Sequence, residues 1–207
     1  MKKSKWIPLI VLLVVFLSGC THTYSAPKEP VRGYQQTSKI PLHVALYLSN
    51  ELRTAKWEKQ ILGDTFQVPL GDAFVQNSEV VARELFIGVM VTNGAAGPAR
   101  SGVDAILIPR MVLAEQTQAM WAFGTNALTV MLEWTLKDAQ ENTIWVDTVK
   151  GEGEANAGNV FTDGMNGRER VKEMLDDLFH KSFQAISSSH AIREFAAARQ
   201  TATAKGP

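Results

Sequence analysis

The sequence predicts an α+β fold, a two-layer sandwich in which a largely antiparallel sheet carries two main helices on one face. Apolar residues alternate with a period of two in several stretches, most clearly from Gly124 to Lys137, which is typical of half-buried strands. The apolar period changes to three or four from about Gly71 to Phe86 and from about Arg168 to Ser187, which indicates amphipathic helices. We therefore expect one folded domain over residues 40–199.

The first half of this domain is expected to contain short strands around the first helix. Leu42 to Leu48 alternates as a strand and places His43 on the face away from the core, exposed or hydrogen-bonded. A polar connection from Ser49 to Lys59 follows, in which Trp57 is expected to fold back over the core. The remaining elements are an extended piece over residues 65–68, the helix, a short strand over residues 89–92 and a loop over residues 93–98.

The second half is expected to supply most of the sheet. Residues 104–113 are apolar on both faces in their first half, which is typical of a central strand covered on both sides. Pro109 cannot donate to a ladder, so we expect a bulge or a change from inner to edge pairing there. The later elements are a hairpin of residues 124–137 and 143–151, a glycine-rich stretch over 151–167, the second helix, a short helical stretch over 191–199 and a disordered tail over 200–207.

The first twenty residues read as an export signal. Three lysines precede the eleven-residue stretch Trp6–Phe16, which is well short of the roughly 20 apolar residues that a membrane-spanning helix needs. The tetrapeptide Leu17-Ser18-Gly19-Cys20 follows and resembles the lipobox of bacterial lipoproteins. The resemblance implies that residues 1–19 are removed and that Cys20 is lipidated. The alternative is a cleaved secretory signal in which Cys20 is incidental.

Residues 20–39 are expected to form a flexible tether after the lipidated cysteine, because they are polar and interrupted by proline and glycine. An extended tether of this length would let the domain stand up to about 65 Å from the bilayer. Alternatively, Tyr24 and Tyr34 mark a docking segment. Thr21 occupies the position where lipoproteins retained in the inner membrane usually have aspartate. The resemblance to sorted lipoproteins therefore favours the outer membrane, with the domain facing the periplasm.

Charge and motif content exclude several classes of function. Removal of three lysines leaves 18 basic and 21 acidic side chains, a near-neutral balance that argues against nucleic acid as a partner. A single cysteine excludes an intramolecular disulfide and a thiolate metal cluster. We find no catalytic motif and no metal-ligand spacing among the four histidines, and we therefore expect no enzyme activity, cofactor or metal. Gly151-Glu152-Gly153-Glu154 lacks the third glycine of a nucleotide-binding turn, and Asp176 and Asp177 point about 100° apart on a helix.

One apolar stretch falls where a polar turn is expected. Trp121 and Phe123 lie in the connection between two long strands, and large apolar side chains in loops often contact a partner or a membrane. The alternative is that the two rings cap the open end of the core. We take Trp121 and Phe123 as candidate partner-contact residues.

The layout resembles the YajG family of uncharacterised outer-membrane lipoproteins. The resemblance rests on the Leu17–Cys20 tetrapeptide, the hairpin from Leu128 to Val149 followed by a long helix, and the ending from Ser188 to Phe195. More distantly, the layout is similar to periplasmic domains of curli-secretion and polysaccharide-export lipoproteins, which form rings. These resemblances imply an accessory component of an envelope transport or assembly system that contacts other envelope proteins or itself. The alternative is a binder of a small lipid or glycan, which requires an apolar cavity between sheet and helices.

Overall fold

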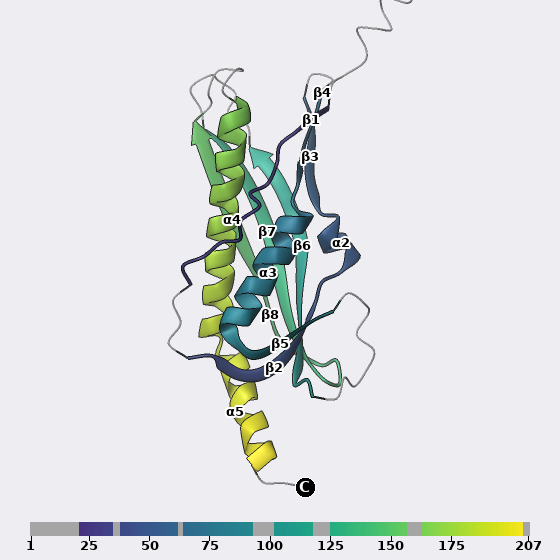
Figure 1. Ribbon diagram of the computed structural model, residues 1–207, viewed down its shortest axis with the longest axis vertical. Helices are drawn as coiled ribbons and strands as arrows, with labels where there is room; N and C mark the ends of the chain where they lie inside the picture. The colour runs from purple at the N-terminus through teal and green to yellow at the C-terminus, as the bar shows by residue number, and fades with distance from the viewer. Residues whose placement is uncertain are drawn as a thin grey trace, which may run out of the picture.

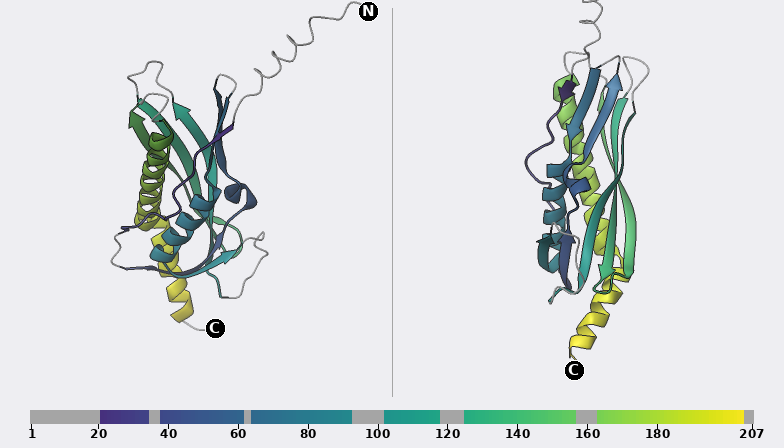
Figure 2. Two further views of the ribbon diagram at one scale, coloured as in Figure 1. Left: turned by 45° about the horizontal axis from the view of Figure 1, so that its top comes forward. Right: turned by 90° about the vertical axis from the view of Figure 1, so that its right-hand side faces the viewer.

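A computed structural model describes residues 21–34, 38–61, 64–92, 102–117, 125–156 and 163–204. It confirms the α+β sandwich: a five-stranded sheet of order β5-β2-β6-β7-β8 packs against helices (Figure 1). Helices α3 (Gly71–Leu85) and α4 (Asp163–Ser188) cover the same face of this sheet, as Figure 2 shows. Their aromatic rings meet there, with the centroids of Phe74 and Phe179 6.2 Å apart. No described helix is long and apolar enough to cross a bilayer.

The main sheet is antiparallel at one side and parallel at the other. The antiparallel part pairs β6 with β7 and β7 with β8, while β2 runs parallel to both β5 and β6. The two antiparallel pairings join many more residues than the two parallel ones, in line with the expected largely antiparallel sheet, but the parallel pairs were not predicted. The bounds are β2 (Ile40–Tyr47), β5 (Phe86–Thr92), β6 (Ala105–Thr117), β7 (Thr125–Asp138) and β8 (Thr143–Asn156).

The alternation of β7 determines which side chains enter the core. Every second residue from Leu128 to Leu136 is at most 3% exposed, whereas the residues between them are half-buried on the opposite face. The same alternation buries Leu42, Val44 and Leu46 of β2 and leaves His43 exposed, as predicted. These buried residues meet the apolar stripes of α3 and α4 in one continuous core.

Pro109 occupies the position where the sequence conflicts with a central strand. β6 pairs with β2 only over Ala105–Leu107, so pairing on that side ends before Pro109 and the missing N–H is not required there. Pro109 still lies opposite Trp134 of β7, and the register shift of β6 falls later, between Met111 and Leu113. The predicted change from inner to edge pairing is therefore the correct one of the two alternatives.

A second sheet, of order β1-β4-β3, was not predicted. It contains β1 (Thr21–Thr23), β3 (Lys56–Ile61) and β4 (Asp64–Pro69). The expected polar connection from Ser49 to Lys59 is wrong in its second half, because β3 forms an antiparallel hairpin with β4. The short helix α2 (Asn50–Arg53) fills its first half, where the Ser49 side chain accepts a hydrogen bond from the Leu52 N–H. Trp57 is buried, but it enters the core from a strand.

Three expected boundaries differ from the structure. β8 continues to Asn156 and α4 begins at Asp163, so most of the glycine-rich stretch over 151–167 is regular structure. Helix α5 (His190–Ala204) extends into the range expected to be a disordered tail, because Ile192 and Ala196 are buried and fix its first half on the domain. Residues 93–98 lie outside the described residues.

Residues 21–34, here called the N-terminal strap, contact the domain instead of forming the free tether that composition indicates. In Figure 1 the strap leads from β1 along α4. Val31 is 6% exposed, and its N–H donates to Asn77 Oδ1 of α3 at 2.7 Å. The strap docks because a few apolar and aromatic side chains among its polar residues pack against the core, which removes their apolar surface from water.

Candidate functional site

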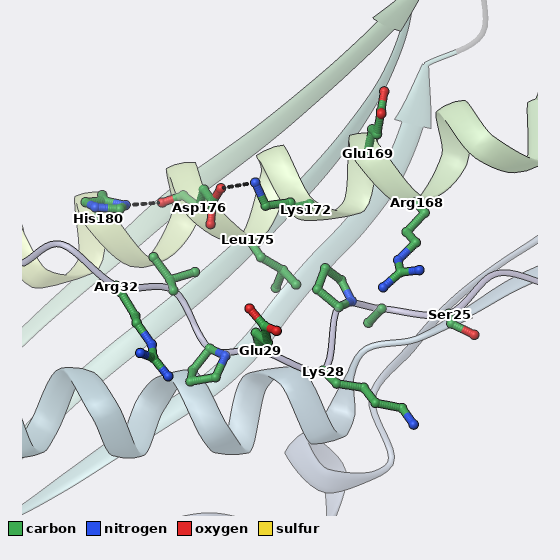
Figure 3. Close-up of a pocket in the computed structure, with 14 residues that line it drawn as sticks. Ser25, Lys28, Glu29, Arg32, Arg168, Glu169, Lys172, Leu175, Asp176 and His180 are labelled. Atoms are coloured by element: carbon green, nitrogen blue, oxygen red, sulfur yellow. Dashed lines mark hydrogen bonds and ion pairs between the residues drawn. The ribbon is translucent and has the colours of Figure 1, made fainter.

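The strap and helix α4 form an open groove of about 1000 Å³ (Figure 3). Strap residues 25–32 form one wall, and one face of α4 forms the other. The side chains that line it are mostly polar or charged: Ser25, Lys28, Glu29, Arg32, Arg168, Glu169, Lys172, Asp176 and His180, with Leu175 at its base. This is the candidate site because it joins two regions that are distant in the sequence.

The N-terminal end of the strap is fixed by backbone pairing. β1 runs parallel to β4, with Thr21 beside Thr65 and Thr23 beside Gln67. The Tyr24 N–H donates to Gln67 O at 2.9 Å, and Gln67 Nε2 donates to Thr23 Oγ1 at 2.9 Å. The strap thus begins as a strand of the second sheet.

The middle of the strap is fixed by a buried polar contact. Asn77 is 2% exposed; its Oδ1 accepts from the Val31 N–H, and its Nδ2 donates to Ala73 O at 2.7 Å. The asparagine therefore satisfies a buried backbone donor that would otherwise lack a partner. The sequence alone does not reveal this role, because the partner lies 46 residues away.

The C-terminal end of the strap is fixed by aromatic contacts. Tyr34 stacks on Phe183 of α4, with ring centroids 4.8 Å apart and an interplanar angle of 17°, and it lies 5.2 Å from the His180 ring. The Tyr34 hydroxyl is buried and has no hydrogen-bond partner among the described residues. Burial, reinforced by the charges of Asp176 and Glu84, raises the pKa of Tyr34 well above its ordinary value, so the phenol stays neutral.

The charges along the groove are nearly balanced. Four cationic and three acidic side chains line it, and Lys172 Nζ lies 3.7 Å from Asp176 Oδ2. His180 Nδ1 lies 2.8 Å from the backbone oxygen of Asp176, so this ring nitrogen is engaged with its own helix. The arrangement therefore suits an extended polar segment better than a strongly charged ligand, and it does not assemble a nucleophile with a base.

Other sequence motifs have structural roles in the described part of the chain. Asp177 accepts from Lys181 Nζ at 2.6 Å and from the Glu152 N–H at 3.0 Å, whereas Asp176 faces Lys172, so the two carboxylates do not form a pair. No cluster of three or more potential metal-ligating side chains occurs among residues with described positions.

Gly151 and Gly153 allow β8 and α4 to approach closely. A Cβ added at Gly153 would lie 2.0 Å from Arg170 O, and one added at Gly151 would lie 2.4 Å from Leu178 Cβ. Real Cβ atoms do not approach other atoms so closely. The two glycines of the Gly-Glu-Gly-Glu stretch therefore serve helix–sheet packing.

The space between sheet and helices holds large side chains. Trp134, Phe74 and Phe179 are fully buried there, and Trp134 Nε1 donates to Ser182 Oγ at 2.9 Å. These side chains occupy the volume that a lipid chain would need. The lipid-binding alternative, which requires an apolar cavity in this place, gains no support from the described core.

The three residues predicted to form sites, Cys20, Trp121 and Phe123, lie outside the described residues. β6 ends and β7 begins at the same end of the molecule as β1 (Figure 1). The roles of these three residues therefore stay predictions.

Comparisons with known proteins identify the fold. No protein-family model matches the chain, and no curated protein matches it in sequence. Among solved structures, protein XCC0632 from Xanthomonas campestris, described with the family model DUF330, is 10% identical and has a TM-score of 0.52. The match covers 86% of this chain and 99% of that one.

Two further structures are similar in part. A minor lipoprotein from Acinetobacter baumannii is 11% identical over 72% of this chain and 93% of its own, with a TM-score of 0.45. Lipoprotein GNA1162 from Neisseria meningitidis is 14% identical over 60% of this chain and 92% of its own, with a TM-score of 0.36. None of these three likenesses names the YajG family, so that resemblance stays a prediction. At 10% identity, the likeness to XCC0632 shows a similar fold and nothing further.

Proposed function

We propose that this chain is a non-catalytic lipoprotein, held on the periplasmic face of the outer membrane by lipid on Cys20. It serves there as an accessory component of an envelope transport or assembly system. The observation that carries the proposal is the Leu17-Ser18-Gly19-Cys20 tetrapeptide directly before β1. Two or more acyl chains on one residue would hold the protein stably, because each buried methylene contributes about 0.8 kcal/mol.

The groove supports an interaction role. Its walls carry balanced charges, and one wall is a chain segment held by a few contacts, which suits the docking of another protein segment. The expected self-association or contact with other envelope proteins is part of this proposal, as is a contact through Trp121 and Phe123.

The anchor is tested by mass spectrometry of the mature protein. We expect an N-terminal residue at Cys20 that carries diacylglyceryl and acyl groups, and partition of the protein into the detergent phase. The Cys20→Ser variant should lack the added mass and remain in the aqueous phase. A mature wild-type protein without acyl groups would overturn the anchor.

The interaction role is tested by crosslinking in cells. A photoreactive amino acid at Phe123 or at Lys28 in the groove should yield a discrete crosslinked species, identified by mass spectrometry. The matched control position is the exposed Glu154 of β8. Equal, diffuse crosslinking from all three positions would count against a specific partner at either surface.

A further inference from the structure

We propose that the strap holds the domain end-on against the bilayer, with the β3–β4 hairpin beside the lipid headgroups and α5 directed away from them. This inference rests on the proposed lipid anchor at Cys20 and goes beyond it. The anchor by itself gives a location, whereas the strap gives an orientation. The partner that the β3–β4 end of the molecule contacts is the membrane surface.

The first argument is the length of chain between lipid and domain. Thr21 is bonded directly to Cys20 and already lies beside Thr65 in the second sheet. Consecutive Cα atoms are about 3.8 Å apart, so the lipid-bearing residue lies within one peptide of β1. The freedom of a tether of about 65 Å is therefore absent while the strap stays in place.

The second argument is that the strap is held at separate points along its length. β1 pairs with β4, Val31 binds Asn77 on α3, and Tyr34 stacks on Phe183 of α4. Release of one contact leaves the others, so the domain moves away from the bilayer only after the β1 pairing itself is lost. Such local opening has its own free energy, separate from global unfolding.

The third argument is the shape of the molecule. In Figure 1, with the longest axis vertical, β1 and the β3–β4 hairpin lie at one end and α5 lies at the other. α4, with 26 residues, accounts for about 39 Å of that axis at 1.5 Å per residue. An anchor at the β1 end therefore presents α5 to the periplasm, at a distance from the membrane.

The surface at the β1 end of the molecule is polar, as expected for a surface that contacts lipid headgroups. The side chains of Thr21, His22 and Thr23 are exposed, and threonine hydroxyls both donate and accept hydrogen bonds. Glu58 of β3 lies level with Thr23 on the far side of β4, and it forms an exposed ion pair with Lys56. Polar groups of this kind remain solvated among phosphates and water, without insertion into the hydrocarbon.

The orientation is tested by energy transfer in vesicles of phosphatidylethanolamine and phosphatidylglycerol that carry the purified, lipidated full-length protein. Cys20 is the single cysteine of the chain and its thiol is blocked by lipid, so an introduced cysteine labels selectively. Glu58→Cys reports on β3, and Ala198→Cys reports on the exposed side of α5. With a headgroup-linked acceptor, we expect at least twofold higher transfer from position 58 than from position 198.

A flexible insert provides the control. Twenty glycine and serine residues between Cys20 and Thr21 add a coil of roughly 25 Å and leave β1 intact. We expect this insert to lower the transfer from position 58 by at least half and to bring it close to that from position 198.

The outcomes separate the two proposals. A wild-type protein that does not float with the vesicles overturns the lipid anchor and the orientation together. A floating protein with equal transfer from the two positions, or with transfer that the insert leaves unchanged, overturns the orientation alone.

Discussion

The β7–β8 hairpin with α4 and the N-terminal strap are held to the domain by different means. The hairpin is held by continuous burial, with fully buried Trp134 and a helix that approaches β8 at two glycines. The strap is held by a short parallel pairing, one buried hydrogen bond and one aromatic stack. Global stability therefore resides in the hairpin region, whereas the strap is able to open locally. The segment that can open locally, the strap, is therefore the one next to the proposed anchor.

The largest expected effect comes from filling the close contact between β8 and α4. Gly153→Val places side-chain atoms against the Arg170 backbone, which forces the helix from the sheet and lowers the free energy of unfolding by about 3 kcal/mol. Chemical denaturation measures the change. Glu154→Ala, an exposed change in the same strand, is the control. Equal midpoints for the two variants would contradict the packing role of Gly153.

A smaller loss of stability is expected when the buried Trp134 indole loses its hydrogen-bond acceptor. Ser182→Ala leaves Trp134 Nε1 without its acceptor and should lower the free energy of unfolding by about 2 kcal/mol. Ser188→Ala is a matched control, because both hydroxyls also donate to the carbonyl four residues earlier and Ser188 is exposed. If both variants unfold at the same denaturant concentration, the indole contact does not stabilise the core.

The strap should respond locally and not globally. Asn77→Ala leaves the buried Val31 N–H without an acceptor, so amide exchange over residues 24–34 should accelerate about tenfold. The global unfolding free energy should change much less. Hydrogen exchange followed by mass spectrometry measures both, and Gln76→Ala on the exposed side of α3 is the control. A change spread evenly over the domain would erase the distinction between the two regions.

The smallest effect concerns alkaline pH. The raised pKa of Tyr34 means that the folded protein retains a proton which the unfolded chain loses above the ordinary value of 10.0. This contribution to stability is complete below pH 10 and declines as pH rises further. The thermal midpoint should therefore fall more steeply between pH 9 and pH 11 in the wild type than in Tyr34→Phe. Parallel curves would show that the Tyr34 phenol is not buried against α4.

Several expectations from the sequence were confirmed because they depend on local periodicity. The alternation in residues 124–137 and the stripe of Gly71–Leu85 reveal which face of each element is buried. The groove, in contrast, was not predicted. Its walls come from opposite ends of the chain, and the polar composition of residues 25–32 hides the buried Val31. A signal was present in Tyr24 and Tyr34, which the sequence marks as an alternative docking segment for a partner and which both pack against the core of their own domain.

By itself, the sequence determined the α+β class, the main strands and helices and the exclusion of a disulfide, because these follow from composition and short-range pattern. The tertiary structure decided the second sheet, the parallel pairing of β2, the role of Gly151 and Gly153, and the docking of the strap. The physical reason is that each of these depends on a partner distant in the chain. Whether a polar segment is a free tether or a strap depends on the surface that it meets.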